Sequence, residues 1–368
     1  MSFLALLRLL LFASATLAWS SQACAQHEHE HSSSEFDIFL SAEALRASDH
    51  VQRGDDDPWF AADVVFALTK HQFRIFGEYF VSAEEHDLER FQVGYEFVPE
   101  TTLWLGRFHQ PGSAWNTEHH HGRYLQTAIT RPSIEFWEDQ HGLIPQHITG
   151  ALLESRIAVG QEAAIQFSSG IGAGPALTPD GYEPIDLVDN NPGHHRLSIT
   201  ARLAYLPEYV GATSAGFLFG HHELDVRDPK VAQALIAGRA NLDVFGAYAD
   251  WNRDPWRLIA AAYYVRFDPA QASMRESFIA GYAQIEHQLA FRLTAFGRTE
   301  NSARMRQSRF VAMFDDQDGD FDITVRRNAA GLRWDFARRQ ALSIELSRVD
   351  ALTYRANEIR AQWSAAVP

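Results

Sequence analysis

The sequence predicts an all-β protein, an antiparallel transmembrane β-barrel of about 16 strands with a long third extracellular loop folded into the lumen. Three observations predict it. Polar and apolar residues alternate over long segments throughout the chain. Aromatic residues are plentiful, with 25 Phe, 11 Tyr and 9 Trp. The connections between the alternating segments are short and long in turn.

The first 25 residues read as a secretory signal peptide. Arg8 is their only charge, the apolar run that follows ends near Trp19, and Ala23-Cys24-Ala25 is a small-x-small cleavage pattern. The run is too short to cross a bilayer and ends at a processing site. Cleavage would remove the only cysteine, so we expect no disulfide and no thiolate metal site in the mature chain.

Residues 26–34 are expected to form a periplasmic N-terminal tail ahead of a barrel over residues 35–368. His27, His29 and His31 alternate with glutamates in this tail. Such a segment can collect divalent metal weakly. It can equally be a solubilising lead, and the sequence leaves both readings open.

Alternation predicts the strands one by one. In 90–97, Phe91, Val93 and Tyr95 share a face, while Arg90 and Gln92 lie on the other. A period of two means a strand with one apolar and one polar face. The expected strand centres are Ile38, Val64, Ile75, Val93, Leu105, Leu152, Phe167, Ile199, Phe217, Phe245, Ala261, Ala280, Leu293, Leu332, Ile344 and Ile359. Fourteen or eighteen strands stay open, because the segments around Phe245 and Phe310 are ambiguous.

A soluble β-sandwich also alternates, so the barrel needs further support. The expected strands approach the ~9–11 residues of a tilted bilayer crossing. Aromatics stand near strand ends, as in interfacial girdles: Trp59, Tyr95, Trp104, Trp256, Trp334 and Trp363. Tight connections such as 98–102 and 337–340 alternate with long polar ones such as 47–58 and 174–194. This is the arrangement of periplasmic turns and extracellular loops.

Charge limits the range of partners. The net charge of −15 argues against nucleic acid, whose recognition needs clustered positive charge. Acidic loops would concentrate cations, whereas arginines on the polar strand faces would bind anions, and the preference stays open. The arginines expected on the lumen wall are Arg90, Arg196, Arg202, Arg292, Arg298 and Arg333.

The longest loop, from about Gln110 to Thr149, carries the candidate site. In or directly before it lie six of the 17 histidines. The expected constriction and binding residues are His109, Trp115, Glu118, His119, His120, His121, Arg123, Arg131, Glu138, His141 and His147. Two of the consecutive histidines, His119 and His121 among them, could bind Zn²⁺, Cu²⁺ or Ni²⁺ with Glu118, His141 or His147 as a further ligand. They could instead only hydrogen-bond the loop in place. Imidazole titrates near pH 6.5, so acidification should add positive charge to this loop.

A resemblance adds to this reading. The secretion signal, the alternating strands, the acidic loops and the long third loop resemble Gram-negative porins. Segments 105–132 (LGRFHQPGSAWNTEHHHGRYLQTAITRP) and 136–150 (FWEDQHGLIPQHITG) resemble a largely uncharacterised porin-like group that is distantly similar to phosphate-selective porins. The resemblance covers the mature chain as architecture only and carries over no functional residue.

The function that we expect is passive diffusion of small hydrophilic solutes or ions across the outer membrane, with a possible relation to divalent metal. We expect no enzyme and no cofactor beyond weakly bound metal. The partners should be outer-membrane lipid, the solute and further copies in a homotrimer. The alternatives are an outer-membrane hydrolase, which would need a paired Ser-His or Asp-His at the rim, and a structural or adhesive barrel with a plugged lumen.

Overall fold

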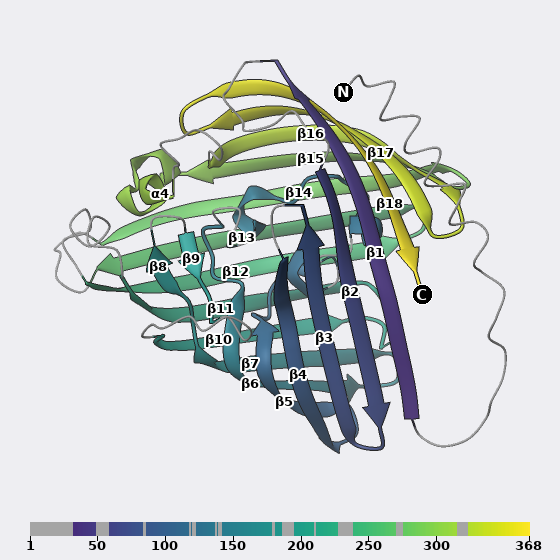
Figure 1. Cartoon of the computed structure of the whole chain (residues 1–368), viewed down its shortest axis with the longest axis vertical. Helices are drawn as coiled ribbons and strands as arrows, with labels where there is room; N and C mark the ends of the chain where they lie inside the picture. The colour runs from purple at the N-terminus through teal and green to yellow at the C-terminus, as the bar shows by residue number, and fades with distance from the viewer. Residues whose placement is uncertain are drawn as a thin grey trace.

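The computed structural model describes residues 32–48, 59–83, 86–117, 119, 123–136, 138, 142–178, 181–185, 195–209, 211–226, 238–269, 275–314 and 323–368. In these residues, sixteen antiparallel strands close into one barrel, as predicted. Each strand pairs with its neighbour along the chain, and β1 closes the barrel against β18. Figure 1 shows β1–β5 running steeply across the near side, with β10–β16 crossing behind them.

Every expected strand centre falls within a barrel strand. The strands are β1 (Ser32–Ala47), β2 (Trp59–Lys70), β3 (Phe73–Ser82), β4 (His86–Val98), β5 (Thr101–His109), β6 (His147–Val159), β7 (Ala163–Ala173), β10 (Leu197–Leu206), β11 (Ser214–Asp225), β12 (Arg239–Arg253), β13 (Trp256–Pro269), β14 (Glu276–Ala290), β15 (Leu293–Ala303), β16 (Thr324–Ala337), β17 (Gln340–Ala351) and β18 (Arg355–Val367). β1 begins at Ser32 and so includes the last residues of the segment expected to be a tail.

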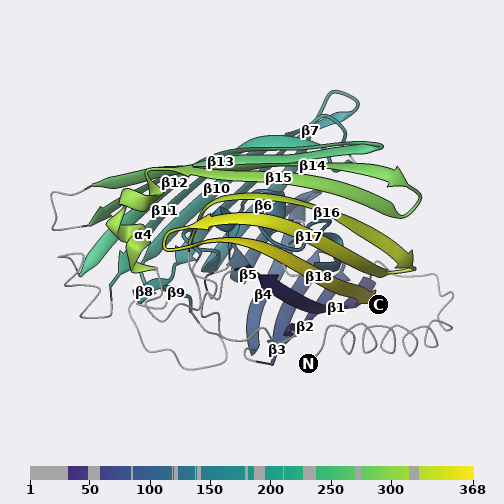
Figure 2. The ribbon, with the colours of Figure 1, turned by 90° about the horizontal axis from the view of Figure 1, so that it is seen from above.

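Several helical segments and one small hairpin are not part of the barrel wall. β8 (Ala176–Thr178) pairs with β9 (Gly181–Glu183). The ambiguous segment around Phe310 is a helix, α4 (Arg309–Met313), preceded by the 3₁₀ turn η3 (Met305–Gln307). None of the helices in the described residues has the length and apolar character of a membrane crossing. Figures 1 and 2 place α4 and the β8–β9 hairpin at the same end of the barrel, which we call the long-loop end.

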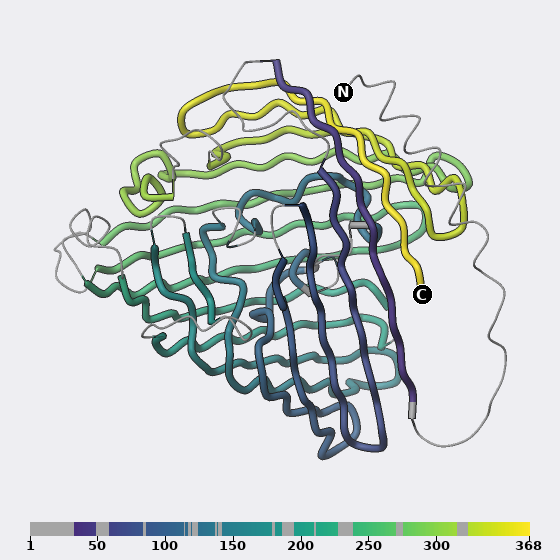
Figure 3. Tube along the Cα trace, viewed as in Figure 1, coloured from purple at the N-terminus to yellow at the C-terminus, as the bar shows by residue number. Residues whose placement is uncertain are grey.

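The opposite end carries the tight turns, and the trace in Figure 3 passes through them directly from strand to strand. β2–β3, β4–β5, β14–β15 and β16–β17 are each joined by two residues. One residue in each of these turns has a positive φ without being glycine: His71, Glu100, Arg292 and Arg339. Positive φ at a non-glycine residue is uncommon and typical of turns. The short connections predicted from the sequence are thereby confirmed.

The two faces of the wall have opposite chemistry, with the apolar side chains outside. In β17, Ile344 and Leu346 are 56% and 55% exposed, whereas Glu345 between them is 0% exposed. In β10, Leu203 and Tyr205 are exposed and Thr200 and Arg202 are buried. A water-soluble protein rarely leaves such a continuous apolar surface open, but a membrane barrel turns this face to lipid.

Aromatic side chains mark the end of the barrel with the tight turns. Tyr95, Trp256 and Trp334 are 41%, 42% and 52% exposed and stand close to the short turns, as interfacial aromatics do. Trp363, expected to belong to the same girdle, is 6% exposed and packs with Ala42 and Ala365. Its burial against neighbouring strands removes it from the exposed set.

Candidate functional site: the loop between β5 and β6

The connection between β5 and β6 is the candidate site. It contains the short helix α2 (Ala114–Thr117) and the 3₁₀ turns η1 (Arg123–Leu125) and η2 (Ser133–Glu135). The neck of the loop continues the β5–β6 ladder, since His109 pairs with His147 and the Gln110 amide donates to the Gln146 carbonyl at 2.8 Å. The loop therefore ends at Gln146, three residues earlier than expected.

A buried carboxylate on the far wall holds the middle of this loop. Glu345 of β17 accepts hydrogen bonds from the backbone amides of Ile129 and Thr130 at 2.9 and 3.1 Å. Its other oxygen accepts the Thr130 hydroxyl at 2.5 Å. A charged acceptor strengthens hydrogen bonds of this kind. The loop thus contacts the polar face of a strand more than 200 residues away in sequence.

Two of the arginines expected on the wall hold the loop as well. Arg298 of β15 donates to the Thr130 carbonyl at 2.5 Å and to Glu300 at 2.9 Å. Arg333 of β16 donates to the carbonyls of Tyr124 and Gln126 at 2.6 and 2.5 Å. Arg333 also pairs with Asp335 of the wall at 2.8 Å, so both guanidinium groups bind loop backbone as well as a wall carboxylate.

A second carboxylate lies within the loop. Glu135 is 2% exposed and accepts the hydroxyls of Ser113 at 2.6 Å and Tyr282 at 3.1 Å, and that of Tyr263. Arg131 donates to the Glu135 carbonyl at 2.9 Å and to the Asn116 side chain at 2.8 Å. Buried polar groups are stable when hydrogen-bonded, and this network fixes the loop against β13 and β14.

Apolar packing adds to these hydrogen bonds. Trp115, Ile134 and Leu143 of the loop belong to one buried cluster with Tyr182 of β9 and Phe310 of α4. Wall residues complete the cluster, including Leu224, Val244, Phe267 and Phe278. The loop, the β8–β9 hairpin and α4 therefore share one core with the wall.

Three other arginines expected on the wall each contact a different partner. Arg90 of β4 pairs with Glu78 at 2.5 Å and lies over the Phe76 ring. Arg202 of β10 donates to the Tyr248 hydroxyl at 2.7 Å. Arg196, directly before β10, pairs with Asp225 at 3.0 Å.

The prediction that Arg292 belongs to the lumen wall is wrong. It lies in the two-residue turn between β14 and β15, with φ at 66° and its guanidinium over the neighbouring Phe291 ring. The alternation of the following strand does not extend into the turn, because the left-handed backbone there reorients the side chain.

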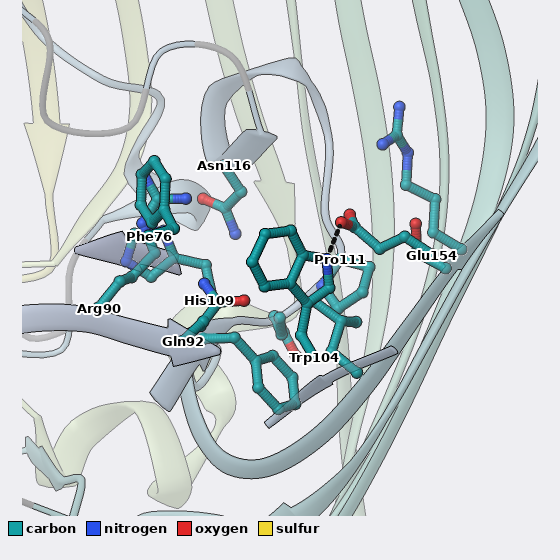
Figure 4. A pocket seen from close by; sticks show the side chains of 13 residues that line it. Phe76, Arg90, Gln92, Trp104, His109, Pro111, Asn116 and Glu154 are labelled. Carbon is teal, nitrogen blue, oxygen red and sulfur yellow. Dashed lines mark hydrogen bonds between the residues drawn. The ribbon is translucent and has the colours of Figure 1, made fainter. Parts of the chain in front are cut away.

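A pocket of about 170 Å³ lies between the neck of the loop and the wall. Figure 4 shows Pro111 and Asn116 of the loop together with Arg90, Gln92, Trp104 and His109 of the strands. The Trp104 indole donates to Glu154 at 2.9 Å. Other lining residues are Phe76, Phe108, Gln110, Leu152, Ser168 and Arg202. Cationic, anionic and aromatic side chains thus surround one small space.

Among the consecutive histidines, the structure describes His119. Its ring is 5% exposed and packs on Trp115, with centroids 5.4 Å apart. Burial first, and then the positive charges of nearby arginines, lower the pKa of His119 to about 3. The expectation that this imidazole gains charge near neutral pH is therefore wrong. Glu118, His120, His121, His141, His27, His29 and His31 lie outside the described residues, as does the side chain of Arg123.

A different pair of histidines comes together at the neck. His109 and His147 have ring centroids 4.8 Å apart. The Nε2 atom of His147 lies 2.8 Å from Glu89, and its Nδ1 atom lies 2.6 Å from Glu138. Glu89, His109 and His147 are the one group of three or more potential metal ligands found in the described part of the chain.

Glu89 was missed by the sequence reasoning, although a signal exists. Phe91 pairs with Arg107 across the β4–β5 hairpin. Glu89, two residues before Phe91, therefore lies beside His109, two residues after Arg107. Centring that hairpin on its tight turn would have placed Glu89 opposite Gln110, one residue away from His109, because the register shifts between Glu96 and Val98.

Comparison with solved structures places the fold among outer-membrane channels. The chain is similar to the anion-selective porin from Comamonas acidovorans, with a TM-score of 0.61 and 10% identity over 92% of this chain and 100% of that one. It is similar to the outer-membrane channel DcaP of Acinetobacter baumannii, with a TM-score of 0.58 and 11% identity over 94% and 100%. OmpT of Vibrio cholerae, solved in a trimer form, gives 0.53 and 9% over 91% and 99%.

These likenesses show the fold, a porin-like closed barrel. No protein-family model matches the chain, and no curated protein matches it by sequence. The likeness to phosphate-selective porins in particular stays a prediction.

Proposed function

We propose that this protein is an outer-membrane channel for passive diffusion of small hydrophilic solutes or ions. The observation that carries the proposal is the closed barrel with its apolar face outward and charged residues such as Arg90, Arg202 and Glu154 inward. A barrel of sixteen strands is wide enough for an aqueous lumen. The loop between β5 and β6 narrows that lumen by its contacts with β13–β17.

The contact between the loop and the wall is made by buried side chains of both signs of charge. Arg298, Arg333 and Arg131 lie on or against the loop, and Glu345, Glu300 and Glu135 lie beside them. Rings of one charge sign select for the opposite ion. These paired charges form no ring of a single sign, which supports passage of small hydrophilic solutes with weak ionic preference.

Planar-bilayer recording tests this function. Purified, refolded protein should insert and give ohmic single-channel steps, and the reversal potential under asymmetric salt should report the ionic preference. A protein that migrates more slowly on a gel after boiling than before was folded before boiling. If such protein gives no current over a wide voltage range, diffusion through this barrel is refuted.

A plugged, structural barrel is the second candidate. The observation that favours it is the apolar cluster in which Trp115, Leu143, Tyr182 and Phe310 join the loop, the hairpin and α4 to the wall. Silent insertion with confirmed folding would support it.

Assembly into a homotrimer completes the proposal. The structurally similar OmpT of Vibrio cholerae has a trimer form, and the exposed apolar wall of this chain provides a surface for lipid or for a second copy. Chemical crosslinking in detergent, resolved before and after boiling, would separate a trimer from a monomer.

A further inference from the structure

We propose that Glu89, His109 and His147 form a binding site for one divalent transition-metal ion of the Zn²⁺ class. The site lies at the neck of the loop and would tie both ends of the loop to β4. It uses none of the consecutive histidines His119–His121 and none of the tail histidines, and it does not depend on whether the barrel conducts.

The backbone brings the three ligands together. His109 is the last residue of β5 and His147 the first of β6, and they are register partners. Directly opposed residues of antiparallel strands have Cβ atoms about 4.5–5.5 Å apart. Glu89 reaches the pair from β4, the other neighbour of β5. One residue from each of three adjacent strands therefore meets at one point.

The donor atoms are close enough to share an ion. One imidazole nitrogen from each histidine and one Glu89 oxygen all lie within 4.8 Å of one another. Zinc binds nitrogen and carboxylate oxygen at about 2.0–2.2 Å. Small rotations of the three side chains would bring the donors to that distance. Glu89, His109 and His147 are 6%, 7% and 5% exposed, so bulk water competes little for the ion.

The ligand set selects the class of metal. Two imidazoles and one carboxylate are a common set for Zn²⁺, with a further position left for water. Imidazole also suits Cu²⁺ and Ni²⁺, whereas Mg²⁺ and Ca²⁺ prefer oxygen ligands. The site should therefore discriminate against Mg²⁺.

Glu138 supplies the outer support that such a site needs. Its Oε2 atom lies 2.6 Å from the Nδ1 atom of His147, which leaves the Nε2 atom directed at Glu89. Its Oε1 atom accepts the backbone amides of Gln146 at 2.8 Å and His147 at 3.3 Å. Carboxylates that bind the remote nitrogen of a histidine ligand fix the ring for the metal. Because Glu138 belongs to the loop, the ion would couple to loop position.

The competing state is an ion-paired cluster without metal. In that state, His147 bridges the carboxylates of Glu89 and Glu138, and these contacts are the ones the structure contains. Arg107 is compensated by Asp87 at 2.6 Å and adds no unpaired positive charge to the cluster. Metal binding would release the Nε2 proton of His147 to water and exchange the contact between His147 and Glu89 for a bond from each residue to the ion.

Metal titration distinguishes the two states. The protein would carry no polyhistidine tag, and His27, His29 and His31 would be changed to Gln to remove the imidazoles of the N-terminal tail. Calorimetric titration of the EDTA-treated, refolded protein with Zn²⁺ should show one equivalent, with no comparable binding of Mg²⁺. The double variant His109→Gln/His147→Gln should lose this binding. Glu138→Gln should weaken it about 10–100-fold, as loss of an outer partner does.

His221→Gln is the matched control. His221 of β11 also pairs with a carboxylate, Asp243 at 2.7 Å, but belongs to no cluster of three ligands in the described residues, so its variant should bind Zn²⁺ like the parent. Co²⁺ bound in place of Zn²⁺ should show visible absorption that the double variant lacks. The slower gel migration after boiling verifies that each variant is folded.

Two outcomes would overturn the proposal. One is folded parent protein that takes up no Zn²⁺, which would leave the ion-paired cluster as the sole state. The other is equal binding by the parent and the double variant. Neither outcome bears on conductance, so a metal-binding silent barrel and a metal-free conducting one are separable results.

Discussion

Buried charge at single residues decides how the loop is held. Glu345 is 0% exposed and takes three hydrogen bonds from Ile129 and Thr130. Leaving a buried donor without its acceptor costs about 1–3 kcal/mol. Moving the two amides and the hydroxyl away from the Glu345 carboxylate would therefore be unfavourable. The sequence around Thr130 contains no pattern that predicts a contact with a residue of β17.

His119 shows the same dependence on surroundings. The sequence predicts that acid charges this residue, but burial against Trp115 and the nearby arginines lower its pKa to about 3 in the folded protein. The unfolded pKa stays near 6.5. As pH falls below 6.5, the unfolded chain binds a proton that the folded chain does not. Folding stability linked to His119 is thus present above pH 6.5 and is lost as the pH falls towards 3.

We predict from this that His119→Gln flattens the acid dependence of stability. Between pH 7.5 and 5.5 the linked loss in the parent is about 1.4 kcal/mol, and the variant should lack it. Urea unfolding midpoints of both proteins in lipid vesicles at the two pH values measure the difference. Equal pH dependence in the two proteins would mean that His119 is accessible to solvent. The response of conductance to pH over the same interval should be the same in both.

At the scale of the strand, alternation carries the prediction. Strands such as β10 and β17 place apolar residues on one face and polar residues on the other. Every strand centre expected from the sequence lies in a barrel strand. Alternation stops being informative at the strand ends. Arg292 follows a regular pattern in sequence but lies in a two-residue turn with positive φ. Phe310, in an apolar stretch, lies in the helix α4.

A charge on the outer face tests which solvent the strands meet. Leu203, 51% exposed in the middle of β10, and Phe291, 82% exposed in a tight turn, are both apolar and accessible. Leu203→Arg should destabilise the barrel by about 2–4 kcal/mol, and Phe291→Arg by about 0–1 kcal/mol, because the cost depends on bilayer depth. Urea unfolding in vesicles gives both values. If the two variants were equally stable, the apolar face would not be in contact with lipid.

The whole molecule combines a predictable wall with an unpredictable interior. Strand number and the long loop between β5 and β6 follow from alternation and connection lengths. Loop contacts depend on which side chains of distant strands face one another, such as Thr130 with Glu345 or Ser113 with Tyr282. The metal prediction for the consecutive histidines stays untested, because His120 and His121 lie outside the described residues. It relied on adjacent histidines, while the described cluster draws on Glu89, His109 and His147 from three strands.

We predict that the barrel still folds when the loop between β5 and β6 is removed, because the barrel closes through its own strand pairs. His109 and His147 are register partners, and the Gln110 amide reaches the Gln146 carbonyl. Residues 111–145 can therefore be replaced by Asn-Gly, which suits a two-residue hairpin turn. The shortened protein should still migrate more slowly after boiling. Removing the loop also exposes Glu345, Arg298 and Glu300 of the wall to the lumen.

Single-channel conductance of the shortened protein then separates the proposed functions. If the loop is a constriction, the parent conducts and the replacement raises its conductance several-fold, since the narrowest section dominates the resistance. If the loop is a plug, the parent is silent and the replacement opens it. Equal conductance in both proteins would place the loop outside the permeation path, whatever its contacts with β13–β17. The replacement also removes Glu138, so its ionic preference should be compared with that of Glu138→Gln, which keeps the loop and changes one charge at its neck.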